Sequence, residues 1–366
     1  MVTRIESLFT EKVNQITNLK PFNHGTTSIK YDTVSNEKFE VLTHIIYGGW
    51  SIQPTSFKQV REEIFYSNNY KVTGLDGITY LLKHSNNNAQ TQPWVDKATI
   101  YCQTQGIPVS HILQTVDGNT FLVHDGLVYR VDEFIEGEHY DGSRDELIDV
   151  ASQLPNFFHI LENLPPNLRD SIEQDKRTLI HHDWNQLEAL INDQLSQGDK
   201  SLVEEEEIQL IRRFSQLISA SAEKFTSVPI QVIHRDLHPH NLLFDPDDHH
   251  LLAFLDLDAL MISQRIRGIA FAMHRLARTY GNDTERKQDL GSDIRDRMRL
   301  FLNIYQKSGG ELTQDEVELI PYVLLDHTLY AITQIFLHAR EGNKEWPKDL
   351  RKQIELLREI ESIFVI

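Results

Sequence analysis

The 366-residue sequence has very little cysteine and no long apolar run. Cys102 is the only cysteine, which excludes an intrachain disulfide and a thiolate zinc cluster and fits a reducing compartment. The first dozen residues mix charges of both signs and lack the apolar stretch of a secretory signal. The most apolar region, residues 322–338, carries Asp326 and His327 and falls short of the about 20 apolar residues of a membrane helix. We therefore expect a soluble, cytoplasmic protein that spans no membrane.

Positive charge is also scarce. The chain has 36 Lys and Arg against 54 Asp and Glu, a net charge of −18. Binding to duplex nucleic acid requires clustered basic residues, so this balance predicts no nucleic-acid partner. An anionic membrane surface is disfavoured for the same reason. A neutral or cationic small molecule fits better, as does a nucleotide whose charge a divalent metal offsets. No pattern in the sequence predicts an oligomeric state.

The sequence divides into two regions with different residue patterns. Between about residues 46 and 135, short β-type runs alternate with turn signals, and one helix is predicted over 95–105, ended by Gly106 and Pro108. After Gly137 the apolar residues recur at helical spacing, as at Leu350, Ile354, Leu357, Ile360 and Phe364. We expect an N-terminal extension (1–45), a β-rich lobe (46–135) and a helical lobe (136–366), an α+β architecture.

Two details are predicted within the helical lobe. Ser201 and Glu204 have the spacing of a capping box, which predicts a helix start there. Three short apolar runs, at 230–233, 241–244 and 251–255, predict small strands separated by polar clusters.

The densest polar cluster lies between these strands. It comprises His234, Arg235, Asp236, His238, His240 and Asn241, and Asp256 and Asp258 follow. Charged groups on an apolar hairpin cost free energy unless they are paired, so the cluster is a functional candidate rather than a solvated turn. One interpretation is a metallohydrolase in which the histidines and Asp236 bind zinc or iron. That interpretation leaves Asn241, Asp256 and Asp258 without a role.

Phosphoryl transfer from ATP accounts for the whole cluster. This reaction needs a base beside the acceptor hydroxyl, an Asn and an Asp that hold Mg²⁺, and a Lys on the phosphates. In kinases the order is His-Arg-Asp, an Asn five residues later, and an Asp on the following strand. His234-Arg235-Asp236, Asn241 and Asp256 have this spacing.

The first lobe offers the residues that such a site would need for the nucleotide. Lys83 ends the apolar run 78–83 and supplies the strand-borne lysine. Residues 66–70, with Ser67 and Asn68, are expected to cover the phosphates. The connector between the lobes, with Glu133, Phe134 and Ile135, is expected to present backbone groups to adenine.

These motifs resemble the aminoglycoside phosphotransferase and choline kinase-like family of small-molecule kinases. The resemblance extends over roughly residues 38–339 and is strongest at 232–244 and 254–258. It implies a bilobal protein-kinase-like fold, with Asp236 as the catalytic base, Asn241 and Asp256 as Mg²⁺ ligands, and Lys83 on the α- and β-phosphates. Asp258 would lie near the metal or the acceptor.

Three features depart from the family pattern. The first-lobe helix carries the shorter Asp96 where relatives often have a Glu that pairs with the lysine. The nucleotide loop has no glycine, and the first 40 residues have no counterpart. Residues 25–28 have the composition of a phosphate-binding loop, but such short runs are common in ordinary turns, and we expect a turn there.

The expected function is therefore ATP- and Mg²⁺-dependent transfer of the γ-phosphate to a hydroxyl of a small molecule. Aminoglycosides, amino alcohols, sugars and amino acids are the candidate acceptors, and the negative charge of the chain favours a cationic one. The alternatives are a non-catalytic, kinase-like nucleotide-binding protein and the His/Asp metallohydrolase.

Overall fold

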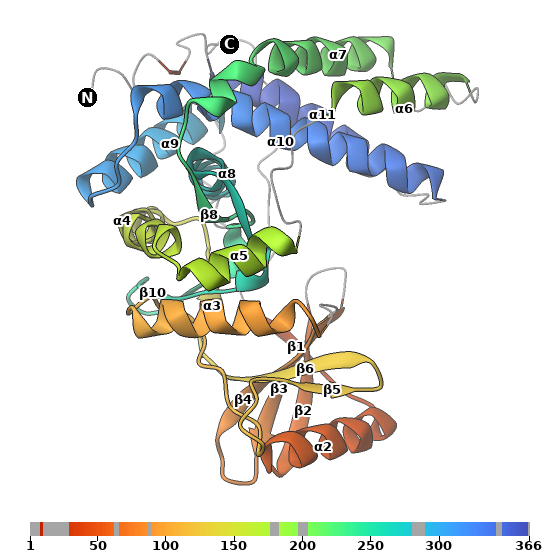
Figure 1. The fold of residues 1–366 in the computed structure, drawn as a ribbon, viewed down its shortest axis with the longest axis vertical. Helices are drawn as coiled ribbons and strands as arrows, with labels where there is room; N and C mark the ends of the chain where they lie inside the picture. The colour runs from red at the N-terminus through yellow and green to blue at the C-terminus, as the bar shows by residue number, and fades with distance from the viewer. Residues whose placement is uncertain are drawn as a thin grey trace.

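The computed structural model describes residues 8–9, 29–61, 66–85, 89–175, 183–196, 204–279, 290–341 and 346–364. An antiparallel six-stranded sheet in the order β1-β2-β3-β4-β6-β5 forms the first lobe (Figure 1). Its strands are β1 (Lys30–Thr33), β2 (Pro54–Arg61), β3 (Tyr66–Gly74), β4 (Thr79–Ser85), β5 (Leu122–His124) and β6 (Leu127–Glu133). Helix α2 (Asn36–Trp50) covers the sheet, and its Leu42, Ile45 and Ile46 share a small core with Val72, Leu82 and Val131.

The predicted boundary at residue 46 is therefore too late in the chain. Strand β1 pairs with β2 over Lys30–Thr33, and α2 buries its apolar face against the sheet. Residues 30–45 belong to the first lobe because the sheet needs this helix to cover its core. Of the rest of the predicted extension, Phe9 forms a β-bridge to Phe364 and stacks on its ring at 5.4 Å. Residues 25–28 lie outside the described residues.

Helix α3 (Gln92–Thr104) lies between the two lobes (Figure 1). It begins three residues before the predicted start, and Gly106 follows it with a φ of +79°. Its apolar side, with Trp94, Val95 and Ala98, joins the large core of the second lobe. Although it was predicted as part of the first lobe, α3 thus packs mainly on the second.

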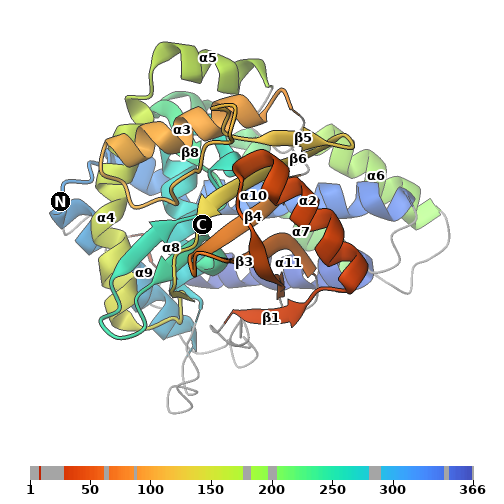
Figure 2. The same ribbon diagram turned by 90° about the horizontal axis from the view of Figure 1, so that it is seen from below.

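The second lobe is mostly helical, with α8 in its centre and α6 and α7 at its outer edge (Figures 1 and 2). Its helices are α4 (Arg144–Glu162), α5 (Pro166–Gln174), α6 (Trp184–Ser196), α7 (Glu205–Ala220), α8 (Arg265–Ala277), α9 (Leu290–Lys307), α10 (Gln314–Arg340) and α11 (Trp346–Ile363). Helix α10 is long and apolar enough to cross a membrane by composition, but 67% of its most apolar window is buried inside the protein. Its apolar residues are part of this lobe's core.

Two small sheets carry the polar cluster. One has the order β10-β9-β7, and the other pairs β8 with β11. Their strands are β7 (Glu138–His139), β8 (Ile230–His234), β9 (Leu242–Phe244), β10 (Leu251–Phe254) and β11 (Leu260–Gln264). The three strands predicted within the helical lobe are confirmed as β8, β9 and β10.

Two predicted helix features have different outcomes. The C-terminal stripe is confirmed, since Leu350, Ile354, Leu357, Ile360 and Phe364 are all buried. The start of α7 was predicted too early. Glu204 is the residue that precedes the helix, and its backbone N–H donates to the Glu207 carboxylate at 3.0 Å. The glutamates at 204–207 thus supply the cap of the helix themselves, and Ser201 lies outside the described residues.

A buried ion cluster joins α8 to α11 and predicts a pH-dependent stability. The Glu359 carboxylate contacts His274 Nε2 at 2.8 Å and Arg278 Nε at 2.9 Å. Burial would raise the pKa of Glu359, but Arg278 and His274 together lower it to about 2.

Replacing this carboxylate should weaken the fold most at neutral pH. Because the folded-state pKa lies below the usual 4.5, the ionised carboxylate stabilises the fold above pH 4.5, and the benefit is lost as pH falls toward 2. We expect Glu359→Gln to lower the free energy of unfolding by about 3 kcal/mol at pH 7 and by about half of that or less near pH 3. Urea unfolding at both pH values measures the difference, and an equal loss at both would contradict the assignment.

Candidate active site

One cavity between the lobes brings together most of the predicted nucleotide and metal residues. It has a volume of about 150 Å³ and is lined by Lys83, the connector residues Glu133, Phe134 and Ile135, and Asn241 and Asp256 from the second lobe. These residues come from β4, from the end of β6 and the chain that follows it, and from the region after β8. Residues far apart in the sequence therefore meet at the junction of the two lobes.

The connector can approach β9 closely because it contains Gly137. A Cβ atom at this position would lie 2.9 Å from the Phe244 carbonyl oxygen, which is shorter than real side chains allow. Lys71 on β3 ties the connector to the sheet: its Nζ lies 2.9 Å from the Glu136 carboxylate and 4.2 Å from the centre of the Phe134 ring.

Residues 66–70 do not form the predicted loop over the phosphates. They are the first half of strand β3, and residues 62–65, between β2 and β3, lie outside the described part of the chain. Asn69 lines the cavity. The structure places the backbone of Ser67 and Asn68 in β3 and does not describe their side chains.

His234 organises the loop that carries Asp236. It is fully buried, its Nε2 donates to the Leu255 carbonyl at 3.1 Å, and its Nδ1 accepts the Asp236 backbone N–H at 3.2 Å. Burial lowers the pKa of His234, which favours the neutral tautomer that these two bonds require. Both ring nitrogens are therefore used within the loop, and neither is available to a metal.

Removing this imidazole should impair catalysis more than nucleotide binding. Without His234 the Asp236 backbone loses its anchor, and a displacement of about 1 Å at a reacting group costs about 100-fold in rate. We expect His234→Ala to lower kcat by about that factor, with little change in the KM for ATP. His250→Ala, an exposed histidine at the β9–β10 turn, is the matched control. Normal turnover of the His234 variant would show that the bonds do not position Asp236.

Asp236 itself is half-exposed and ionised. Burial raises its pKa, but His238, His234 and Arg275 outweigh that effect and lower it to about 2. His238 Nε2 lies 3.6 Å from the Asp236 carboxylate, while His238 Nδ1 accepts the His240 N–H at 3.2 Å. So weak a base suits the orientation of a hydroxyl donor better than early proton removal.

Asn241 and Asp256 form an oxygen donor pair. The Asn241 amide nitrogen donates to the Asp236 carbonyl at 2.8 Å, which leaves the amide oxygen for a cation. Asp256 is exposed and has a left-handed backbone, with φ 64° and ψ 48°, a conformation that non-glycine residues adopt mainly at special sites. A carboxylate and an amide oxygen on one cavity fit the preference of Mg²⁺ for oxygen ligands. Asp258 is half-buried on the following turn and lines neither of the two cavities described here.

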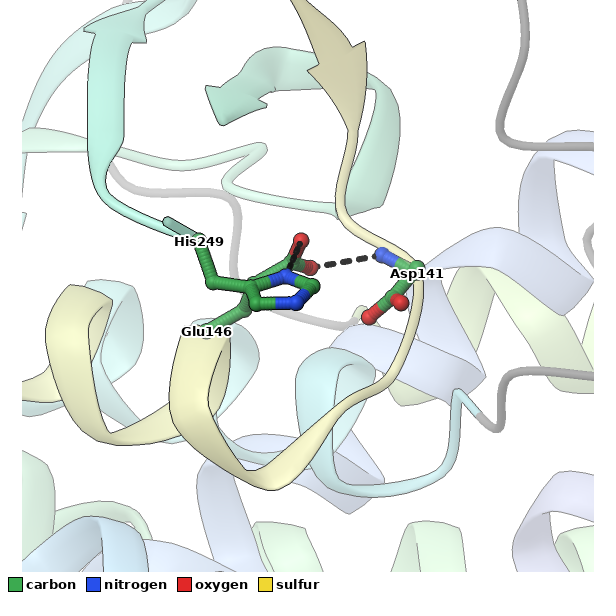
Figure 3. Close-up of side chains that lie close together, drawn as sticks. All are labelled: Asp141, Glu146 and His249. Carbon is green, nitrogen blue, oxygen red and sulfur yellow. Dashed lines mark hydrogen bonds and ion pairs between the residues drawn. The ribbon is translucent and has the colours of Figure 1, made fainter. Parts of the chain in front are cut away.

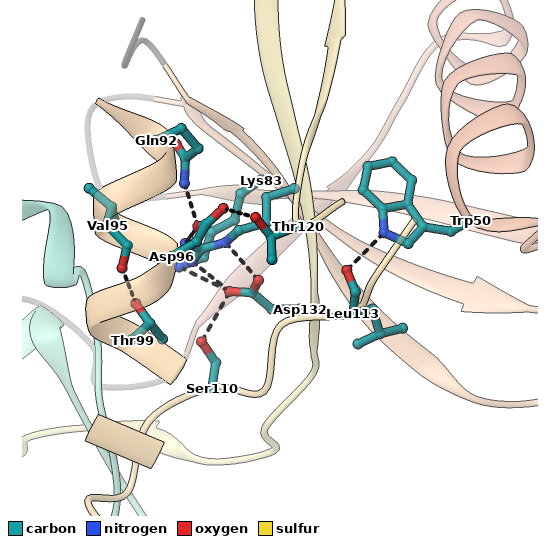
Figure 4. A network of polar contacts seen from close by, with 11 residues as sticks. Trp50, Lys83, Gln92, Val95, Asp96, Thr99, Ser110, Leu113, Thr120 and Asp132 are labelled. Atoms are coloured by element: carbon teal, nitrogen blue, oxygen red, sulfur yellow. Dashed lines mark hydrogen bonds and ion pairs between the residues drawn. The ribbon is translucent and has the colours of Figure 1, made fainter. Parts of the chain in front are cut away.

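A buried charge network orients Lys83 (Figure 4). Lys83 Nζ lies 3.5 Å from Asp132 Oδ2, and Arg130 bridges Asp132 at 2.8 Å and Asp96 at 2.9 Å. Asp96, on α3, also accepts hydrogen bonds from Gln92 and Thr120. Burial raises the pKa of Asp132, but Arg130 and Lys83 outweigh it and hold the pKa below its usual value. Asp96 therefore does not replace the usual Glu partner of Lys83, because Asp132 has that place.

Sequence reasoning did not assign several residues of this site. Arg130 and Asp132 lie at alternate positions of an otherwise apolar strand. Two charged residues on one face of such a strand are unusual, and this pattern could have indicated a functional role. Tyr31 on β1, with His139 and His240, also lines the cavity between the lobes, the proposed nucleotide cavity. Nothing in the sequence indicated that residues before position 46 reach it.

A second, larger cavity adjoins the loop. It has a volume of about 580 Å³, within the usual range for small-molecule sites, and Asp236 and Arg235 lie on its wall. The rest of its lining comes from β8, β11, α8, α10 and α11. Asn241 lines the first cavity and Asp236 lines this one. Because the Asn241 amide donates to the Asp236 carbonyl, the two cavities meet at this loop.

Asp141, Glu146 and His249 form a further polar cluster (Figure 3), in which one ligand atom of each lies within 4.8 Å of the others. The contacts are those of a helix start. Ser143 caps α4 by accepting the Glu146 N–H, Glu146 accepts the Asp141 N–H at 2.8 Å, and His249 Nδ1 lies 3.3 Å from Glu146. Burial raises the pKa of Glu146 to about 8. Both Glu146 oxygens are therefore used in fixing the end of the helix.

Comparison with known proteins identifies the family and the fold. Residues 61–301 match the phosphotransferase enzyme family, whereas no curated protein sequence matches the chain. Among solved structures, an amicoumacin kinase in complex with AMP-PNP and Ca²⁺ has a TM-score of 0.61 at 14% identity, covering 90% of this chain and 95% of that one.

Two other solved structures show the same fold. A microcompartment-associated aminopropanol kinase has a TM-score of 0.60 at 15% identity, with 88% and 94% of the two chains covered. A spectinomycin phosphotransferase in complex with ADP and spectinomycin has a TM-score of 0.57 at 14% identity, with 88% and 98% covered. The predicted bilobal kinase-like fold and the predicted type of enzyme, a phosphotransferase, are confirmed. Because the family match extends over more than half of the sequence, the chain belongs to the phosphotransferase enzyme family.

Proposed function

We propose that this protein is a cytoplasmic kinase that uses ATP and Mg²⁺ to phosphorylate a hydroxyl group of a small molecule. The observation that carries the proposal is the meeting of Lys83, Asn241 and Asp256 on one cavity, with Asp236 on the cavity beside it. Phosphoryl transfer depends mainly on positioning and on charge stabilisation, and these residues supply both.

Each residue then has a separate task. Lys83 binds the α- and β-phosphates, and the connector backbone around Phe134 binds the base. Asn241 and Asp256 hold Mg²⁺, which neutralises phosphate charge when bound. Asp236 accepts the hydrogen bond of the acceptor hydroxyl and turns its oxygen toward the phosphate. Asp258 is proposed to lie near the acceptor or the metal without binding either one directly.

The names of similar structures support nucleotide use and a small acceptor. They include complexes with AMP-PNP, with ADP and spectinomycin, and with GDP and kanamycin. The acceptor of this chain is proposed from the same broad set of aminoglycosides, amino alcohols, sugars and amino acids.

Release of ADP in the presence of candidate acceptors tests the function. We expect ADP release with Mg·ATP to rise well above the acceptor-free rate for at least one compound, to stop with EDTA and to return with excess Mg²⁺. Tight nucleotide binding without acceptor-dependent release would instead favour the non-catalytic alternative. Recovery with Zn²⁺ but not with Mg²⁺ would favour the metallohydrolase, against which the engaged nitrogens of His234 argue.

A further inference from the structure

The larger cavity contains few carboxylates for so acidic a protein. Although the chain has a net charge of −18, Asp236 and Asp349 are the carboxylates among the described residues that line it. Asp349 already has a cationic neighbour, since Lys352 Nζ lies 3.6 Å from it. An acceptor with several ammonium groups would therefore find two carboxylates, of which Asp349 faces Lys352 and Asp236 is needed for the hydroxyl.

The cavity is better supplied with cations. Arg267, Lys352 and Arg235 line it. Arg267 is neutralised, because its guanidinium contacts Asp326 at 2.6 Å and donates to Gln264 at 2.7 Å. Lys352 faces Asp349. The Arg235 guanidinium, by contrast, is exposed and forms no hydrogen bond or ion pair with the residues that the structure describes.

A histidine on the wall of this cavity also lies close to several arginines. His327 of α10 packs against the Phe271 ring at 4.9 Å. His327 keeps an exposed edge, but the partial loss of hydration at the cavity wall lowers its pKa, and Arg275, Arg267 and Arg235 add to this effect against Asp236, which brings the pKa to about 4. His327 is therefore neutral at pH 7 and offers a hydrogen bond rather than a charge.

Arg235 stands next to Asp236 in the chain, and both line this cavity. A guanidinium binds a carboxylate through two parallel hydrogen bonds. We propose that the acceptor is a hydroxylated compound with a carboxylate group, which Arg235 binds while the hydroxyl faces Asp236. The proposal rests on the proposed kinase function and narrows its broad set of acceptors to hydroxylated compounds that carry a carboxylate.

Matched acceptor pairs that differ in one carboxylate test the proposal. The pairs are threonine with 1-amino-2-propanol, gluconate with sorbitol, and pantothenate with panthenol, and kanamycin represents a polycation. With wild-type protein and Mg·ATP, we expect at least one carboxylated member to have a kcat/KM about 10- to 100-fold above that of its partner, from the loss of a charged hydrogen bond. A higher kcat/KM for the uncharged or cationic members, or for kanamycin, would overturn the proposal.

Variants of Arg235 separate recognition from a structural effect. Arg235→Ala should raise the KM for the carboxylated acceptor about 10- to 100-fold, with little change in kcat or in the KM of its partner, and Arg235→Lys should restore part of the loss. Arg351→Ala removes an exposed arginine of α11 that does not line the cavity and is the matched control. Equal effects of Arg235→Ala on both members of a pair would also overturn the proposal.

The proposed kinase function can fail separately. If no compound stimulates ADP release, that function fails, and calorimetric titration of pantothenate, gluconate and threonine in the presence of AMP-PNP decides the carboxylate proposal. Binding that Arg235→Ala weakens would sustain it, and the absence of such binding would overturn it.

Discussion

Replacement of Asp236 by Asn should lower kcat by about 100- to 10,000-fold, the range that general-base groups supply. The variant keeps the size of the side chain but loses its negative charge, so the acceptor hydroxyl is no longer held by a carboxylate. The nucleotide cavity does not include this side chain, and the KM for ATP should change less than about threefold. Single-turnover kinetics with Mg·ATP and an identified acceptor measures both quantities.

Two control experiments test this interpretation. Asp247→Asn makes the same chemical change at an exposed position of the β9–β10 turn and should have wild-type kinetics. Thermal unfolding of the Asp236 variant should show only a small loss of stability, because this side chain is half-exposed and solvent screens its contacts with the neighbouring cations. Near-normal turnover by Asp236→Asn would refute its role beside the acceptor.

Replacement of Asp256 by Ala should remove the dependence of nucleotide binding on Mg²⁺. The carboxylate and the Asn241 amide oxygen are the proposed ligands, and loss of one leaves a single weak donor. We expect the Kd for ATP in the presence of Mg²⁺ to rise by at least about 100-fold, whereas the Kd in EDTA should change little. Calorimetric titration of ATP with and without Mg²⁺ gives both values.

Asp258→Ala is the sharpest comparison for this experiment. Asp258 lies two residues further along and lines neither cavity, so its loss should leave Mg²⁺-dependent binding within about tenfold of the wild type. An equal loss in both variants would make Asp258 a direct ligand. Unchanged Mg²⁺-dependent binding in Asp256→Ala would contradict the metal assignment of Asp256.

The loop of the candidate site was predictable because its spacing follows from local backbone geometry. His234, Asp236 and Asn241 lie within eight consecutive residues and are joined by short-range hydrogen bonds. The apolar runs on either side predicted β8, β9 and β10 for the same reason. The meeting of Lys83 with Asn241 and Asp256 was predicted from the needs of phosphoryl transfer and from the family resemblance, since no local pattern links the two lobes.

Long-range pairing accounts for what the sequence did not reveal. The register of β4 and β6 sets Lys83 opposite Arg130 and Leu81 opposite Asp132, so Asp132 is the diagonal neighbour of Lys83 on the same face. That register cannot be derived from either strand alone. The place of β1 and α2 in the first lobe also depends on pairing with β2, and the larger cavity is formed by helices whose apolar stripes predict burial but not the space between them.

The way Lys83 is oriented has a consequence for control of the enzyme. In protein kinases the lysine is completed by a glutamate on a helix that can swing away, and this motion switches activity. Here the carboxylate comes from β6, in the same hydrogen-bonded sheet as the lysine, and α3 is packed into the core of the second lobe. A displacement of α3 would cost burial and still leave Lys83 beside Asp132. As the proposed phosphate ligand, Lys83 would therefore stay oriented without a switching movement of this helix.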